Sequence, residues 1–268
     1  WFMMYFLSVI LIGTVYPIFL DVISSQKISV GPPFYHKLIV PFLIPFLLMM
    51  AIGPKLKWIK SQLENKIYLI FLLIISILIS FLILKNFDQS ILINTILISS
   101  ALYLFFVTLR DFFIKKYNNI SQNIAHFGFS LLILSILLNN LFSSEIITNL
   151  KVGETFEDSK TKIVFKSINQ KKEKNYNSIT ANFDIFSSNG ELDTLSPELR
   201  IYNQPIIATS EADIKTTLIS DKFIVFNLVN NKDFFNVRYQ VKPFMMWIWL
   251  SVILIASGGI TSFLQRRL

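Results

Sequence analysis

The stretch QNIAHFGFSLLILSILLNNLF, residues 122–142, decides the structural class of this protein. It contains no Asp, Glu, Lys or Arg, and its length is sufficient to cross the hydrocarbon core of a bilayer. His126 lies about one helical turn inside it. An ionisable side chain at membrane depth is energetically costly and by default marks a functional site. We therefore expect a membrane-spanning helix here, with His126 as the leading candidate for function.

Similar apolar stretches recur along the chain. They cover residues 1–20, 38–52, 67–84, 91–109 and 244–264. Of the 268 residues, 53% are apolar and the mean hydropathy is +0.56, which is unusual for a soluble domain. The second stretch is short and contains Pro41 and Pro45, but helix-bending prolines are tolerated in membrane bundles. These patterns predict a polytopic α-helical membrane protein with about six transmembrane helices, five in residues 1–143 and the last in residues 242–268.

Residues 144–241 have a different periodicity. Apolar and polar residues alternate strictly over 179–185 and 235–241, and 162–168 and 222–229 are rich in β-branched and aromatic residues. The composition of 170–177 and 187–191 is typical of turns. We therefore predict a small antiparallel β domain inserted before the last helix.

The distribution of charge gives an orientation. The net charge is +8, but residues 144–241 contain 12 Lys and Arg against 13 Asp and Glu, so the excess belongs to the membrane flanks and does not indicate nucleic acid. The basic residues outside the β domain gather in the loops after the second and fourth helices and after the last. The positive-inside rule places these loops in the cytoplasm or mitochondrial matrix. The β domain is then expected on the periplasmic or intermembrane-space side.

The absence of cysteine excludes several functions for this chain. A thiol–disulfide role and thiolate metal ligands are both impossible, and the β domain must be stabilised without disulfides. The chain starts at Trp1, inside the first predicted helix, and we expect it to be a piece of a longer or split protein.

The immediate neighbours of His126 favour a cofactor. Ala125 and Gly128 remove bulk near the imidazole, whereas Phe127 and Phe129 supply aromatic surface. A helix facing a haem needs such a nitrogen for the iron and space for a flat macrocycle. The alternative is a histidine that forms a hydrogen bond within a helix interface, and both interpretations remain open on the residues alone.

The second histidine, His36, is expected at the opposite membrane face. It follows Gly31-Pro32-Pro33, which we predict to be a rigid turn and not helical. Because about 30 Å of hydrocarbon separates the two faces, His36 and His126 are not expected to bind one iron. We interpret His36 as a polar interface residue.

Other constellations have structural explanations. Glu198, Arg200, Glu211 and Arg238 lie within predicted strands, where ion pairs are the simplest interpretation. Gly258-Gly259 is expected to permit close helix–helix approach. Neither a hydrolytic triad nor a Gly-rich phosphate loop is apparent.

An ordered set of short segments resembles a known family, and together the segments run through nearly the whole chain. They are Gly13-Thr14-Val15-Tyr16-Pro17, Ile28-Ser29-Val30-Gly31-Pro32-Pro33-Phe34-Tyr35, Ala125-His126-Phe127-Gly128, Pro197-Glu198-Leu199-Arg200-Ile201-Tyr202, Thr209-Ser210-Glu211-Ala212, Val237-Arg238-Tyr239, Lys242-Pro243 and Trp247-Ile248-Trp249. This set is similar to the C-terminal part of the CcmF/CycK/NrfE family of cytochrome c-type biogenesis proteins.

The resemblance implies a role in cytochrome c maturation. Such proteins are haem lyase subunits of the bacterial inner membrane or the mitochondrial inner membrane. They receive haem from a CcmE-like haem chaperone and aid its covalent attachment to the CXXCH site of apocytochrome c, together with CcmH/CcmI-like subunits. They hold a membrane haem b as the expected reductant. His126 matches one of its axial ligands, with Ala125 and Gly128 expected to pack against the haem.

The departures from the family pattern limit what this chain is expected to do alone. The family's tryptophan-rich WWD motif, the two histidines that flank it and the second haem b histidine have no counterpart in these 268 residues. Those groups are expected in an N-terminal remainder or split partner, so the chain alone is expected to be inactive as a haem lyase. The alternative function is a cofactor-free membrane assembly subunit whose β domain docks a partner. A transporter is a weaker third possibility, because a proton relay and an ion site are not apparent.

Overall fold

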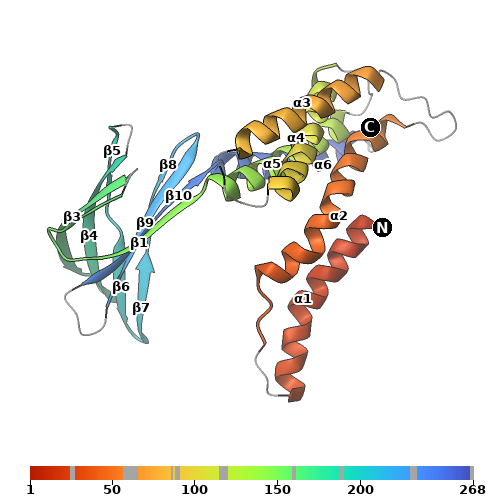
Figure 1. Cartoon of the computed structure of the whole chain (residues 1–268). Helices are drawn as coiled ribbons and strands as arrows, with labels where there is room; N and C mark the ends of the chain where they lie inside the picture. Colours follow the sequence, from red (N-terminus) through yellow and green to blue (C-terminus); the bar gives the residue numbers. More distant parts are fainter. Residues whose placement is uncertain are drawn as a thin grey trace. The chain divides into compact units, whose positions relative to one another are not determined.

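The structure is a computed structural model that describes residues 1–24, 28–56, 66–85, 87, 91–114, 120–158, 161–187, 190–229 and 234–265 (Figure 1). Six helices in these ranges are long and apolar enough to cross a membrane. They are α1 (Phe2–Ser24), α2 (Pro32–Ile52), α3 (Lys66–Leu84), α4 (Ile91–Ile114), α5 (Ile120–Phe142) and α6 (Met245–Gln265), and a short 3-10 turn, η1 (Gly53–Lys55), follows α2. The predicted polytopic α-helical class is confirmed.

The start of α2 corrects one prediction. Gly31-Pro32-Pro33 was expected to form a non-helical turn, but α2 begins at Pro32, and Gly31 is its N-cap. Proline is compatible with the first helical turn, because the missing N–H groups would have no intrahelical partner there and the fixed φ suits a helix. His36 therefore lies in the first turns of α2 and not after a loop.

The chain divides into two compact units, and each is described by itself. One contains residues 1–134 and 251–268, and the other contains residues 135–250. In the first unit, α4 is the most buried helix and packs against α2 and α3. Small polar residues line these contacts: Ser80 on α3 is fully buried and donates to the carbonyl of Thr95 on α4 at 2.9 Å. Such short side chains allow close helix packing in a lipid environment.

The second unit contains an antiparallel β-sandwich, as the periodicity predicts. One sheet has the order β1-β10-β9-β8 and the other has the order β2-β3-β4-β6-β7, with β5 also paired to β4. The strands are β1 (Ser144–Leu150), β2 (Thr155–Glu157), β3 (Thr161–Lys172), β4 (Tyr176–Ser187), β5 (Leu192–Leu195), β6 (Glu198–Asn203), β7 (Ile206–Glu211), β8 (Asp213–Thr216), β9 (Ser220–Leu228) and β10 (Phe235–Pro243).

The alternating residues identified in the sequence form the core of the sandwich. Phe183 on β4 and Phe226 on β9 are fully buried and bring their rings to 6.4 Å between the two sheets. Phe165 on β3 stacks on Phe183 with a centroid distance of 4.4 Å. Because the core is apolar and aromatic, burial compensates for the missing disulfides. The turn predicted over 170–177 is shorter than expected, since β3 continues to Lys172 and β4 begins at Tyr176.

Candidate functional site on helix α5

Helix α5 packs closely against α6 through small residues. A Cβ added to Gly258 would lie 2.7 Å from the backbone nitrogen of Ala125 and 2.9 Å from the carbonyl oxygen of Ser121. A Cβ added to Gly128 would lie 2.9 Å from the backbone nitrogen of Ile255. Such distances leave no space for a side chain at either glycine, so the backbones of the two helices approach as in other small-residue membrane contacts. The expected role of Gly258 is confirmed, whereas Gly259 has no atom within 4 Å of its added Cβ.

A second face of α5 contacts α4. The hydroxyl groups of Thr108 and Ser130 lie 2.8 Å apart, and both residues are buried. The Phe127 ring lies 5.7 Å from the rings of both Phe105 and Phe112. These contacts fix the rotation of α5 about its own axis, because the α6 and α4 contacts fall on different sides of the helix.

His126 lies on the part of α5 between these contacts and those with α2. Its near neighbours on the helix surface are Gln122, one turn before, and Phe129, one turn after. Phe129 meets Phe46 of α2 edge to face, with the ring centroids 6.1 Å apart. His126 is half-buried, and no hydrogen bond among the described residues involves its imidazole. At least one ring nitrogen is therefore open to a ligand that comes from outside these residues.

A buried ion pair stabilises the helix ends near His126. Lys55 Nζ lies 2.7 Å and 2.9 Å from the two carboxylate oxygens of Asp111, and their side chains are 6% and 17% exposed. The Asn123 side chain donates to the Asp111 carbonyl at 3.3 Å, and the Asp111 charge reaches the His126 ring electrostatically. From the sequence, the basic residues after the second helix indicated only the membrane topology, and Asp111 was counted among the acidic residues without a role. Its rarity was a usable signal, because Asp111 is one of only four acidic residues outside 144–241.

The two histidines are too far apart to share a metal ion. Helices α2 and α5 run antiparallel. Phe46 of α2 meets Phe129 of α5, and further along α2 the chain reaches Lys55, which pairs with Asp111. Asp111 is contacted by Asn123, which precedes Phe129 on α5. His36 precedes Phe46 by ten residues, and His126 precedes Phe129 by three residues. Because the helices are antiparallel, the two histidines lie on opposite sides of the Phe46–Phe129 contact, thirteen residues apart along the helix axes. At 1.5 Å per residue the separation is about 20 Å. Two axial nitrogens on one iron are about 4 Å apart, so His36 cannot be the partner of His126.

The residues next to His126 in the sequence pack against other helices of this chain. Gly128 and Ala125 lie against α6, Phe127 against α4 and Phe129 against α2. Haem packing by Ala125 and Gly128 therefore stays a prediction that none of these contacts supports. The imidazole of His126 itself fits an axial-ligand role, because haem needs only a single nitrogen from this helix. Within the described residues, no cluster of three or more His, Asp or Glu side chains could hold a metal ion directly.

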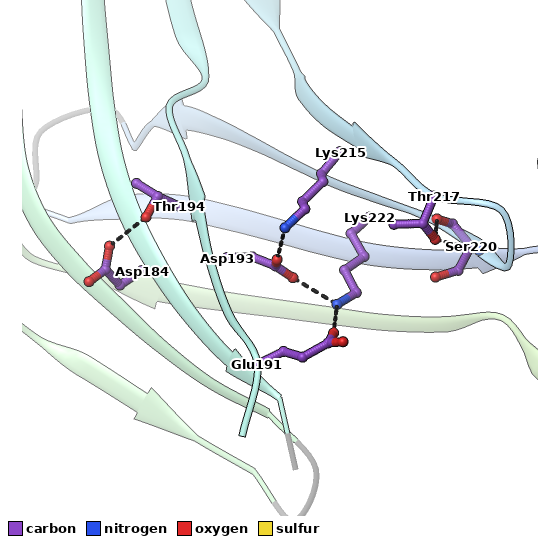
Figure 2. Close-up of polar contacts among 8 residues, drawn as sticks. All are labelled: Asp184, Glu191, Asp193, Thr194, Lys215, Thr217, Ser220 and Lys222. Atoms are coloured by element: carbon purple, nitrogen blue, oxygen red, sulfur yellow. Dashed lines mark hydrogen bonds and ion pairs between the residues drawn. The ribbon is translucent and has the colours of Figure 1, made fainter. Parts of the chain in front are cut away.

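The most buried charge in the β-sandwich has a structural explanation. The Asp193 side chain on β5 is 2% exposed and pairs with Lys215 and with Lys222, the latter at 2.7 Å (Figure 2). Glu191 also approaches Lys222, at 3.3 Å. Burial alone would raise the pKa of Asp193, but the hydrogen bonds from Lys215 and Lys222 outweigh it and hold the pKa below its usual value. The carboxylate is satisfied by the two lysines and joins the strand β5 to β8 and β9.

Arg200 and Arg238, which lie in segments that carry the family resemblance, also form ion pairs. Arg200 donates to Glu198 at 3.0 Å, and Arg238 pairs with Glu145. Hydrogen bonds from Gln240 and then Arg238 lower the pKa of Glu145. Ion pairing of Arg200 with Glu198 and of Arg238 agrees with the structural interpretation of these residues.

Both units of the chain are similar to parts of known proteins. Residues 141–243 match the family model of the CcmF C-terminal beta-sandwich. The chain is 25% identical to the cytochrome c-type biogenesis protein CcmF of Pseudomonas fluorescens, over 97% of the chain and 42% of that protein. It is 24% identical to the cytochrome c-type biogenesis protein NrfE of Haemophilus influenzae, over 96% of the chain and 41% of that protein. The chain therefore spans about two-fifths of the length of the curated relatives it matches.

The fold of the chain is also similar to that of a solved structure. A solved structure, cytochrome c haem lyase CcmF, superposes with a TM-score of 0.72 at 20% identity, over 97% of this chain and 43% of that one. The likeness therefore includes the helices as well as the β-sandwich. Over nearly its whole length the chain is therefore similar to part of the CcmF, CycK and NrfE proteins, and residues 141–243 match the C-terminal β-sandwich of CcmF.

Proposed function

We propose that this chain forms the C-terminal part of a haem lyase subunit of cytochrome c maturation. The observation that carries the proposal is His126, a half-buried histidine on a helix apolar enough to cross a membrane, whose imidazole forms no hydrogen bond with the described residues, in a chain similar to CcmF. The relatives are named as cytochrome c-type biogenesis proteins and, for the solved structure, as a haem lyase. Since the chain covers less than half of those proteins, the activity belongs to the complete assembly and not to these residues alone.

In this proposal His126 is an axial ligand of a membrane haem b. The α5 contacts with α4 and α6 orient the imidazole, and the Lys55–Asp111 pair stabilises the adjacent helix ends. The bound haem would supply an electron to the haem iron awaiting attachment. The second ligand comes from the N-terminal remainder or a split partner, because His36 is about 20 Å away along the helix axes.

The β-sandwich is proposed to lie on the periplasmic or intermembrane-space side and to shape the surface where partners dock. Its near-neutral composition and the basic loops on the other side support this orientation. The expected partners are a CcmE-like haem chaperone, CcmH/CcmI-like subunits and apocytochrome c. The membrane is the bacterial inner membrane or the mitochondrial inner membrane.

The proposal is tested by a reduced-minus-oxidised visible spectrum of the detergent-purified chain, co-expressed with its N-terminal remainder. The variants are His126→Ala and, as the matched control, His36→Ala. We expect a b-type haem signal that is lost in His126→Ala and retained in His36→Ala. A signal retained in both would place the ligand elsewhere. Wild-type protein without haem would favour the alternative, a cofactor-free assembly subunit that docks partners through its β domain.

A further inference from the structure

The turn between β8 and β9 has an unusual composition. Turns are usually built from Gly, Pro, Asn, Asp and Ser, but the centre of Thr217–Ser220 is Leu218-Ile219. These two side chains are 67% and 71% exposed. The turn itself is well formed: the Thr217 hydroxyl donates to the Ser220 carbonyl at 2.7 Å and accepts from the Ser220 N–H at 3.0 Å (Figure 2). A structured turn thus presents adjacent apolar side chains outward. We call residues 217–220 the apolar tip.

The apolar tip lies at the end of the sheet from which the membrane helices leave. In that sheet Ser144 of β1 pairs with Val241, and Pro243 of β10 pairs with Ser220 of β9. β1 follows α5 and β10 precedes α6, so both covalent links to membrane helices are at this sheet end. Neighbouring strands are about 4.8 Å apart, which puts the apolar tip within about 10 Å of the α6 start.

The backbone of the apolar tip is attached to the first turn of α6. The Phe244 N–H donates to the Ile219 carbonyl at 2.7 Å, and the Trp247 indole N–H donates to the Leu218 carbonyl at 3.0 Å. The two central carbonyls are therefore satisfied within the protein. This matters at a bilayer, where an unpaired carbonyl is costly, and it leaves only the apolar side chains to meet the surroundings.

The residues around the apolar tip predict that the membrane boundary falls at the same level. Trp247 and Trp249 are 41% and 64% exposed at the start of α6, where tryptophans favour the headgroup region of a bilayer. On the other side of β10, a polar cavity of about 380 Å³ is lined by Asn139, Asn140, Ser143, Ser144, Glu145, Arg238, Gln240 and Lys242. Polar side chains of this number belong at the headgroups and not in hydrocarbon. The apolar tip is bonded directly to Trp247 and so shares its depth.

We propose that the apolar tip inserts into the lipid interface and holds the β-sandwich on the membrane surface as a third attachment, beside α5 and α6. The occupant is lipid and not protein, because the tip is continuous with the start of a membrane-spanning helix. The basic side chains of the hairpin do not serve an anionic partner there, since Lys215 and Lys222 are neutralised by Asp193 and Glu191. The inference does not depend on haem binding.

The absence of cysteine makes a direct test possible. Leu218→Cys is labelled with the environment-sensitive dye NBD, and the 268-residue chain is reconstituted in phosphatidylcholine vesicles. The matched control is Ile206→Cys, which is also apolar and 85% exposed. Ile206 is the first residue of β7. Ser210 of the same strand forms a hydrogen bond with Asn227, which is near the end of β9, whereas the apolar tip is at the start of β9. Ile206 is therefore remote from the apolar tip. Ile253→Cys on α6 is the membrane-embedded reference.

We expect the dye at position 218 to emit at shorter wavelength than at 206. Lipids spin-labelled near the headgroup should quench it, whereas aqueous iodide should quench position 206 more strongly. At position 253, deeply spin-labelled lipid should be the better quencher. Equal iodide quenching at 218 and 206 would overturn the proposal. A short-wavelength emission at 218 that no spin-labelled lipid quenches would overturn it too, because the tip would then be covered by protein.

Discussion

Substitution of two adjacent glycines should have opposite effects on stability. In Gly258→Ala the new methyl group would lie 2.7–2.9 Å from the backbone of α5, at Ala125 and Ser121. Ordinary contacts between carbon atoms are about 3.5–4.0 Å, so α5 and α6 must move apart by about 1 Å. Overpacking of this kind costs about 1–3 kcal/mol, and the higher helix propensity of alanine offsets about 0.5–1 kcal/mol of it.

Gly259→Ala is the matched control, because its added methyl group meets no atom within 4 Å. It keeps only the propensity gain, about 0.5–1 kcal/mol. We therefore expect the two variants to differ by about 2 kcal/mol in the free energy of unfolding, with Gly258→Ala below the wild type and Gly259→Ala at or above it. Unfolding in mixed detergent micelles, followed by the intrinsic fluorescence of the four tryptophans, measures this difference.

Equal stabilities of the two variants would refute the close packing of α5 on α6. The same comparison has a consequence for the proposed haem site. Since α6 fixes the orientation of α5, Gly258→Ala should broaden or weaken the b-type haem spectrum of the co-expressed protein, whereas Gly259→Ala should leave it unchanged.

Three further predictions concern the β-sandwich. Asp193→Ala leaves the largely buried Lys222 without its main partner, so we expect the free energy of unfolding to fall by about 3 kcal/mol in thermal or denaturant unfolding. Glu191→Ala removes a carboxylate that is itself exposed, and it should cost under about 1 kcal/mol. Because folding lowers the pKa of Asp193, the ionised carboxylate stabilises the fold above its ordinary pKa of about 3.9, and this stabilisation should be lost as the pH falls through the folded-state pKa. Asp193→Asn should remove this acid sensitivity. An unchanged pH profile of stability in Asp193→Asn would contradict the ion-pair assignment. Burial raises the pKa of Tyr239 to about 12. The free energy of unfolding should therefore decline from about pH 10, where the tyrosine of the unfolded chain ionises, until Tyr239 also ionises in the folded protein at about pH 12. Tyr239→Phe should flatten that decline, and an ultraviolet titration should show one tyrosine that ionises at higher pH than the others.

The sequence by itself determined the class of the fold, because both of its signals are local. A run of about 20 apolar residues identifies a membrane helix without knowledge of its neighbours, and strict alternation at Ala181, Phe183 and Ile185 identifies the buried face of a strand. The prolines at the start of α2 were misjudged, since Pro32 is equally compatible with a turn and with a helix start.

Only the tertiary structure decided what the individual side chains of the candidate site contact. Ala125 and Gly128 flank His126 in sequence, which suggested space for a cofactor, but their face of α5 is filled by α6. The Lys55–Asp111 pair joins residues 56 positions apart, and the contact of Trp247 with Leu218 depends on the register of β9 and β10. Contacts of this kind follow from how helices rotate and strands align, and the free energy that sets rotation and register comes from packing between distant segments, which no local pattern contains.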